Sequence, residues 1–180
     1  YKLQQQMHWL PEEVNLADDL KDYREKLSEP NKRLLSQIFR FFTQADVDVC
    51  CGYAKHYLPT FKQPEVRMML AAFASMEAVH QEAYSLLLDT LGYDEGEYKM
   101  FSEIQAMADK HDYLTDFNME NPFEMAKTMA VYSGFTEGVQ LFSSFAILLN
   151  FPRHNLMKGM GQIVTWSIRD ESLHVEGLSE

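Results

Sequence analysis

Four helical segments of this 180-residue chain carry a carboxylate within an otherwise apolar stretch, and this restricts how the chain can fold. Two of these carboxylates belong to Glu-x-x-His sequences, Glu77 with His80 and Glu171 with His174. A spacing of three residues places both side chains of a pair on one face of a helix. Because a buried carboxylate is costly unless it is paired or binds a metal, we expect these faces to meet.

Proline and glycine residues divide the chain into helices, while valine and isoleucine follow a helical rather than an alternating pattern. We therefore expect an all-α protein in which four long helices, of about 25 residues or more, form a bundle. Gly92 is expected to cap the second long helix, and Pro59 to stop the first. A polar loop is expected over residues 112–122. The expected helices are a short charged one to about Leu27, then Asn31 to His56, Pro64 to Leu91, Glu95 to His111, Pro122 to Asn150, and His154 to the chain end.

The two long helices without a Glu-x-x-His sequence each offer a carboxylate as well. Glu137 lies in the apolar middle of its helix, whereas Glu124 is explained by the favourable position of an acid at a helix N-terminus. In the first long helix Asp46 lies on the apolar face, and Asp48 is the alternative. The helices thus alternate along the chain between a single carboxylate and a Glu-x-x-His pair.

This order is the ligand set of ferritin-like di-iron and di-manganese bundles, in which two helices each supply a Glu-x-x-His pair and two supply one carboxylate. Carboxylate oxygens with imidazole nitrogens suit iron or manganese. The sequence therefore predicts a ferritin-like bundle with a dimetal-carboxylate core.

Tyr84 follows His80 by four residues and should lie one helical turn from it. The simpler interpretation is a core tyrosine whose hydroxyl binds a carboxylate. Alternatively, an oxidised dimetal centre could take an electron and a proton from this phenol and leave a tyrosyl radical. Phe73, Leu87 and Phe145 are the apolar residues expected to shield that radical.

Several stretches resemble the small, radical-generating subunit of class I ribonucleotide reductase, over nearly the whole chain and in the same order. They are HWLPEEV near the start, then FFTQAD, MEAVHQEAYSLLLDTLG, GFTEGVQLFSSFA and IRDESLHVEG. The resemblance implies that Tyr84 is the radical site and that Trp9 and Asp170 belong to a radical-transfer route. Asp170 could also orient a histidine, and Trp9 could be a buried anchor. The dimetal ligands that the resemblance implies are Asp46, Glu77, His80, Glu137, Glu171 and His174.

The resemblance also implies an activity. Two iron ions, or a Mn/Fe or Mn2 pair, would react with O₂ and generate the radical at Tyr84. The radical would pass to a separate large subunit, which reduces ribonucleotides to deoxyribonucleotides, so that this chain would be an active enzyme only with that partner. A homodimer is implied as well. One departure is Leu141, where some relatives carry an aromatic residue.

Other functions share this ligand set. A different ferritin-like dimetal oxidase, such as a ferroxidase or a hydroxylase, is disfavoured by Tyr84, by Trp9 and by an aspartate as the first ligand. Tyr84 is only modest evidence against a ligand-binding oxidase related to the small subunit. A metal-storage bundle without enzymatic activity is a further alternative.

The net charge of -11 argues against direct binding to nucleic acid or to an anionic membrane. The two cysteines, Cys50 and Cys51, are adjacent, and neighbours rarely form a disulfide, so a reducing, cytoplasmic location is expected. Residues 1–180 are expected to form one domain. Since the chain opens on Tyr1 and stops at Glu180, directly after the second motif, we expect a domain truncated at both ends.

Overall fold

The computed structural model describes residues 1–93, 104–115, 119 and 121–180. The regular elements in these ranges are helices, which confirms the all-α prediction. The chain begins with α1 (Lys2–Gln6), the 3₁₀ helix η1 (Pro11–Glu13) and α2 (Ala17–Glu25). It continues with α3 (Glu29–Gly52), the π-helix η2 (Tyr53–Tyr57), α4 (Leu58–Thr60), α5 (Pro64–Leu91), α7 (Gln105–Thr115), α8 (Pro122–Ala130), the π-helix η4 (Val131–Leu141), α9 (Phe142–Leu148), α10 (Asn150–Arg153) and α11 (Lys158–Ser179).

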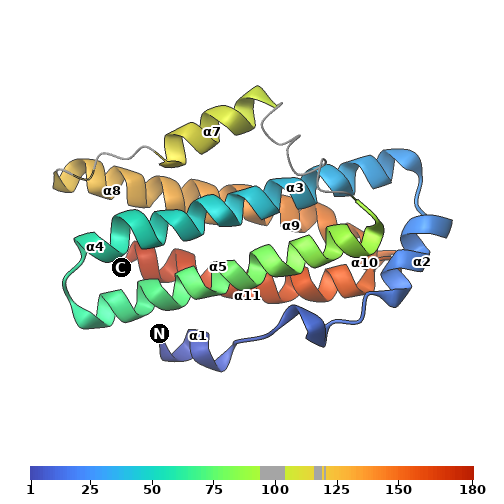
Figure 1. Cartoon of the computed structure of the whole chain (residues 1–180), viewed down its shortest axis with the longest axis horizontal. Coiled ribbons are helices and arrows are strands. Elements are labelled where there is room, and N and C mark those ends of the chain that lie inside the picture. The colour runs from blue at the N-terminus through green and yellow to red at the C-terminus, as the bar shows by residue number, and fades with distance from the viewer. Residues whose placement is uncertain (94–103, 116–118, 120) are drawn as a thin grey trace.

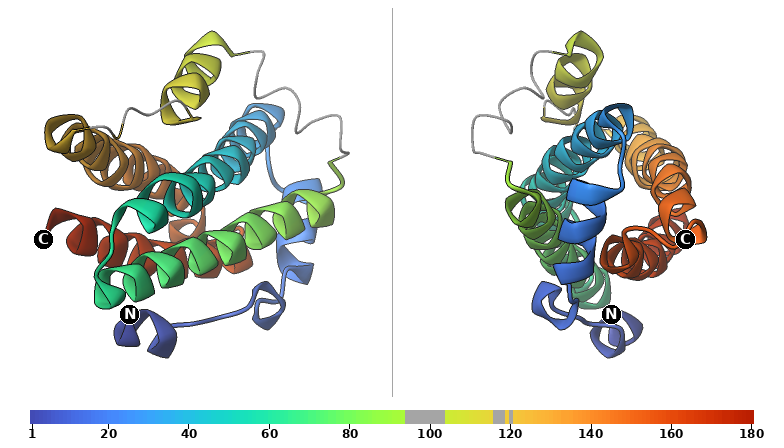
Figure 2. Two further views of the ribbon diagram at one scale, coloured as in Figure 1. Left: turned by 60° about the vertical axis from the view of Figure 1, so that its left-hand side comes forward. Right: turned by 90° about the vertical axis from the view of Figure 1, so that its right-hand side faces the viewer.

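Four long rods form the bundle: α3, α5, the run α8–η4–α9, and α11 (Figure 1). The α3 rod packs along α5, and α11 packs along η4. Seen from the end, the rods surround a common interior, and α2 crosses one end of it (Figure 2). Helix α7 lies outside the bundle against α3. None of the described helices is long and apolar enough to cross a bilayer.

The interior contains two apolar clusters, and the acidic residues lie where these clusters meet. On α3, residues up to Ala45 belong to the first cluster and residues from Val49 onward to the second. Asp46 lies between them. Glu137 likewise falls between Tyr132 of the second cluster and Leu141 of the first. The polar groups are therefore enclosed by apolar packing at both ends of the bundle.

Two helix boundaries differ from those expected at prolines. The first rod does not stop before Pro59 but continues through η2 to Thr60. Pro59 is tolerated because it lies in the last turn of this rod, which ends when the backbone becomes extended at Phe61, so the helical hydrogen bonds before it are kept. The other rod ends its α-helix at Leu148, and Pro152 lies in the short α10.

Other helix boundaries also differ from the predicted ones. Helix α11 begins at Lys158 rather than near His154, because Asn155 and Met157 have left-handed backbone conformations with φ of 63° and 52°. It therefore has 22 residues, fewer than expected. Gly92 caps α5 with φ of 89°, as predicted. Helix α7 runs to Thr115, into the expected loop, while residues 94–103, 116–118 and 120 of the expected helix and loop lie outside the described ranges.

The N-terminus of α11 is capped from a distant helix. The Asp19 carboxylate on α2 accepts hydrogen bonds from the backbone N–H groups of Gly159, at 2.9 Å, and Met160, at 2.8 Å. Asp22 accepts from the N–H group of Met157 at 3.0 Å. The first N–H groups of a helix have no partner within the helix, so these carboxylates join α2 to the rod that carries the second Glu-x-x-His pair.

Replacing Asp19 tests this capping. Asp19→Ala should lower the free energy of unfolding by about 2 kcal/mol, because two buried backbone donors lose their acceptor. Asp18→Ala is the matched control, since Asp18 is the exposed neighbour on the same helix. It should change stability by less than about 0.5 kcal/mol. Urea denaturation followed by circular dichroism measures both, and equal losses in the two variants would contradict the capping role.

Candidate metal centre

Six side chains from the four rods meet in the middle of the bundle. They form two groups whose ligand-capable atoms lie within 4.8 Å of one another. One group contains Asp46, Glu77 and His80, and the other contains Glu77, Glu137, Glu171 and His174. Glu77 belongs to both groups. Each of the six side chains is at most 1% exposed.

The shared carboxylates lie between the two imidazoles. Nδ1 of His80 is 3.1 Å from Oε1 of Glu171 and 3.7 Å from Oε2 of Glu77. Nδ1 of His174 is 2.9 Å from Oε1 of Glu77 and 3.5 Å from Oε2 of Glu171. Glu77 and Glu171 each approach both rings and so lie between the two histidines. The i, i+3 spacing on α5 and α11 produces this convergence, because it puts the acid and imidazole of each pair on one face.

Many atoms of this cluster have no hydrogen-bond partner. They are Oδ2 of Asp46, both carboxylate oxygens of Glu77, Oε2 of Glu137, Oε2 of Glu171 and both ring nitrogens of His174. The short distances between them are close approaches that lack hydrogen-bond geometry. Buried polar groups are normally paired, and an unpaired buried charge is costly. Bound metal ions would satisfy these atoms, and the oxygen and imidazole donors suit iron or manganese. The cluster therefore fits a dimetal centre.

The crowding of four buried acids around two imidazoles changes the pKa values of most of these groups. Burial raises the pKa of Asp46 well above its usual range, and it raises the pKa of Glu137 to about 7 against the effect of His174. Burial also acts upward on Glu171, but its contacts with His174 and His80 outweigh this and lower its pKa to about 2. Both imidazoles have a raised pKa, since the carboxylates outweigh the effect of their burial. Protons on these rings would compete with a cation, so metal affinity should fall as pH falls.

Tyr84 lies one turn from His80, as expected, and is 1% exposed. Its hydroxyl donates to Oγ of Ser167 at 3.2 Å, rather than to a carboxylate of the cluster. Its ring stacks on Phe42, with centroids 4.6 Å apart, and Phe42 in turn contacts Phe145. Burial raises the pKa of the Tyr84 hydroxyl. The site is thus dry and aromatic.

One of the residues expected around Tyr84 lies elsewhere. Leu87 and Phe145 belong to the same apolar cluster as Tyr84, whereas Phe73 belongs to the second cluster. The Phe73 ring instead contacts His174, with centroids 4.2 Å apart. The shift in position follows from the helix period: Phe73 is eleven residues before Tyr84, or about three turns along α5.

A hydrogen-bonded route leads from Trp9 to the cluster. Nε1 of Trp9 donates to Oδ2 of Asp170 at 2.8 Å, and the same oxygen is 3.3 Å from Nε2 of His80. The other oxygen of Asp170 accepts from Gln4 at 3.1 Å. Trp9, Asp170 and His80 are all buried. Gln4 was not singled out in the sequence, because nothing in the pattern of α1 marks it as buried.

Asp48, the alternative to Asp46, faces a different element. Its carboxylate accepts from Gln44 at 2.9 Å and lies 2.8 Å from Nδ1 of His111 on α7. Asp48 is also buried, so burial alone would not separate the two acids. A second residue that the sequence analysis missed is Tyr53, whose hydroxyl donates to Oε1 of Glu137 at 2.6 Å. Tyr53 lies seven residues after Asp46 on the same rod, but it begins a π-helical segment that the sequence pattern does not mark.

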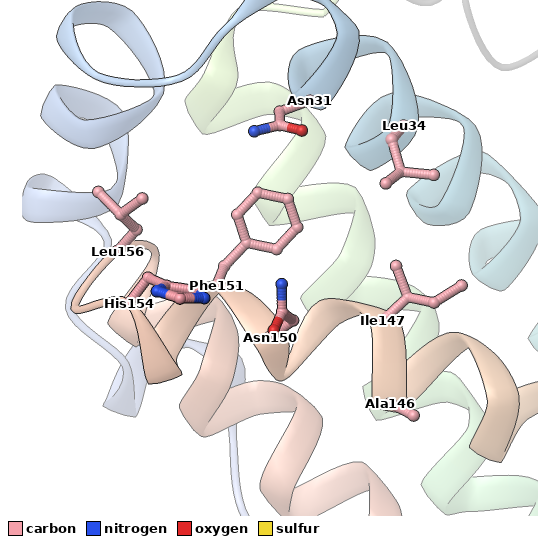
Figure 3. Close-up of a pocket in the computed structure, with 8 residues that line it drawn as sticks. All are labelled: Asn31, Leu34, Ala146, Ile147, Asn150, Phe151, His154 and Leu156. Atoms are coloured by element: carbon pink, nitrogen blue, oxygen red, sulfur yellow. The ribbon is translucent and has the colours of Figure 1, made fainter.

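A surface pocket of 590 Å³ lies between α3 and the α9–α10 corner and is separate from this cluster. Figure 3 shows its lining: Asn31, Leu34, Ala146, Ile147, Asn150, Phe151, His154 and Leu156. None of the six clustered residues contributes to it. The candidate metal centre is therefore distinguished by its buried donors and not by an open cavity.

Comparison with known proteins agrees with this geometry. The family model for the ribonucleotide reductase small chain matches residues 1–180. A protein of Invertebrate iridescent virus 6, named as a probable ribonucleoside-diphosphate reductase small subunit, is 50% identical over 187 residues, which cover 96% of this chain and 52% of the relative. The beta subunit from Chlamydia pneumoniae is 29% identical, over 93% of this chain and 53% of its own length. The chain spans about half the length of the curated relatives it matches.

Solved structures show the same fold. The ribonucleotide reductase R2 subunit from Clostridium botulinum superposes with a TM-score of 0.89 at 20% identity, covering 99% of this chain and 58% of that one. An R2-like ligand-binding oxidase superposes with a TM-score of 0.80, also at 20% identity, over 98% of this chain and 71% of that one. These similarities confirm the ferritin-like fold. The match of the family model over residues 1–180 shows that this chain belongs to the ribonucleotide reductase small-chain family.

Proposed function

We propose that this chain is part of the small subunit of a class I ribonucleoside-diphosphate reductase and generates a tyrosyl radical at Tyr84. The observation that carries the proposal is the buried cluster itself, two groups of ligand residues that share Glu77 and contain many atoms without a hydrogen-bond partner. The buried phenol of Tyr84 lies one turn from His80 and supplies the oxidisable group.

The six clustered residues would hold two metal ions. Asp46 and His80 would serve one ion, Glu137 and His174 the other, and Glu77 and Glu171 lie between the imidazoles. When bound, the metal pair would supply the reaction with O₂ that oxidises the phenol. Iron is the proposed metal, although the dimanganese(II)-NrdF of Streptococcus sanguinis and an R2-like ligand-binding oxidase with a Mn/Fe cofactor share the fold. A mixed or dimanganese pair is therefore the alternative cofactor.

The protein's own residues would protect and transmit the radical. Phe42 and Phe145 exclude water from Tyr84, and Ser167 accepts its hydroxyl proton in a hydrogen bond. The hydrogen bonds from Trp9 through Asp170 to His80 would provide the radical-transfer route towards a large subunit. Asp170 would also keep His80 in one orientation, since its oxygen faces Nε2 while Nδ1 faces the cluster.

The partner proposed for this chain is the reductase large subunit, on which nucleotide reduction would occur. A homodimer and a cytoplasmic location are proposed with it, on the grounds of the family. The two free cysteines are consistent with a reducing compartment. Neither nucleic acid nor membrane is proposed as a partner, given the net charge of -11.

Metal binding should be measurable as stability. For each ion bound, Mn(II) at 100 times its dissociation constant should raise the free energy of unfolding by about 3 kcal/mol. Glu77→Gln should abolish this gain, because Glu77 serves both groups. The metal-free variant should still be no less stable than the wild type, since one of four crowded buried carboxylates is removed. Glu82→Ala, at an exposed position on the same helix, is the control and should keep the full gain. Thermal unfolding with and without Mn(II) checks this, and a full gain in Glu77→Gln would contradict the ligand assignment.

Radical formation tests the proposed function directly. Metal-free protein loaded with Fe(II) without air and then exposed to O₂ should show a tyrosyl radical by electron paramagnetic resonance. Tyr84→Phe should lose the signal and still oxidise iron, whereas Tyr57→Phe should keep both, because the Tyr57 hydroxyl binds Thr128 away from the cluster. Iron oxidation without a radical in the wild type would favour a ferroxidase or a ligand-binding oxidase instead.

A further inference from the structure

Tyr53 is a second buried tyrosine at the candidate metal centre, and it contacts a ligand residue directly. It is 0% exposed, and its hydroxyl donates to Oε1 of Glu137 at 2.6 Å. The Tyr84 hydroxyl, by contrast, donates to Ser167. Tyr53 is therefore the phenol that is positioned to act on the carboxylate of Glu137.

Packing holds the Tyr53 ring from several sides. Its centroid is 6.0 Å from Phe73 and 6.2 Å from Tyr57, and it meets the His174 ring edge-on at 6.2 Å. Phe73 also packs on His174 at 4.2 Å. A fixed ring fixes the position of its hydroxyl oxygen, so the hydrogen bond to Glu137 is built into the fold and is not a chance contact of a mobile side chain.

Both partners of this bond come from π-helical segments. Tyr53 is the first residue of η2, and Glu137 lies within η4 on the facing rod. Segments of π-helix occur frequently at functional sites, because the wider turn displaces side chains from their α-helical directions. Two such segments here deliver the two ends of a single hydrogen bond.

The bond divides the two oxygens of Glu137 between different tasks. Oε1 is held by Tyr53, while Oε2 is buried and has no hydrogen-bond partner. In the other group, Asp46 and His80 make no hydrogen bond with Tyr53. Removing the Tyr53 hydroxyl should therefore affect one side of the centre more than the other.

We infer that Tyr53 is a positioning residue that orients Glu137 for a divalent first-row metal ion at the group of Glu77, Glu137, Glu171 and His174. The inference rests on the proposed function, since it requires that this group bind metal. Partners that orient a ligand in this way typically contribute 10- to 100-fold to metal affinity, by general experience with such sites, so an effect of about this size is expected.

Titration of the metal-free chain with Mn(II) under anaerobic conditions tests the inference, with free Mn(II) measured by electron paramagnetic resonance. The wild type should bind two equivalents. Tyr53→Phe should bind one equivalent as the wild type does and the second about 10- to 100-fold more weakly. Tyr57→Phe is the matched control: it removes a hydroxyl from the same π-helix, but one that binds Thr128, and it should bind both equivalents normally.

A rescue variant separates positioning from packing. Para-aminophenylalanine at position 53 keeps a hydrogen-bond donor at the same place on the ring, and it should restore part of the lost affinity. Failure to restore any would attribute the loss to packing and overturn the inference. If Tyr53→Phe bound both Mn(II) equivalents more weakly to the same degree, the inference would also be overturned.

A further measurement needs no variant and so does not depend on the folding of one. In the wild-type chain loaded with diamagnetic Zn(II), the Tyr53 hydroxyl proton should remain protected from exchange in nuclear magnetic resonance spectra. Faster exchange of this proton after Zn(II) loading would show that the hydrogen bond from Tyr53 to Glu137 breaks when metal binds, contrary to the inference. Normal binding of two equivalents by Tyr53→Phe would overturn the inference and leave the metal centre intact. A wild type that binds fewer than two would overturn both.

Discussion

Four carboxylates and two imidazoles share one buried volume in this protein with too few hydrogen-bond partners, and the bundle is arranged around that constraint. The rods supply these polar side chains close to the boundary between the two apolar clusters. An isolated charge in such a place would cost several kcal/mol, and the acids and imidazoles offset one another only in part. Burial raises the pKa of Asp46, whereas the contacts of Glu171 with His174 and His80 outweigh its burial and lower its pKa. Metal ions are the partners that this chemistry lacks.

The surroundings of the cluster have two distinct sides. On one side Tyr84 lies among phenylalanines, with its hydroxyl on Ser167. On the other side Tyr53 bonds directly to Glu137 and packs beside His174. The first environment isolates a phenol from water. The second uses a phenol to hold a carboxylate still. Two buried tyrosines at one centre are thus suited to different tasks because their hydroxyl partners differ.

Periodicity explains how much of this could be predicted from the sequence. Glu77 with His80, and Glu171 with His174, keep an α-helical spacing, so their convergence followed from the i, i+3 rule and from the cost of burying acids. Glu137 was identified because it is the acid in the apolar middle of its helix. The preference for Asp46 over Asp48 rested on the apolar face, and the structure places Asp46 with Glu77 and turns Asp48 towards His111.

The features that could not be predicted occur where the chain departs from regular α-helical spacing. The π-helical segments leave no signal in hydrophobic periodicity, so the path of the first rod through Pro59 and the approach of Tyr53 to Glu137 were missed. The start of α11 was misplaced because two residues without glycine's freedom, Asn155 and Met157, have left-handed backbone conformations. Gln4 is buried only by tertiary contacts of a five-residue helix. Such features arise when the elements pack, and local sequence does not encode them.

Anomalous diffraction from crystals of this chain soaked in Mn(II), recorded on both sides of the manganese absorption edge, tests the central claim most directly. The account predicts two manganese peaks inside the cluster, one beside His80 and one beside His174, with Glu77 within coordinating distance of both. A single peak, or peaks confined to surface carboxylates while the cluster keeps its arrangement, would contradict a dimetal centre at these residues.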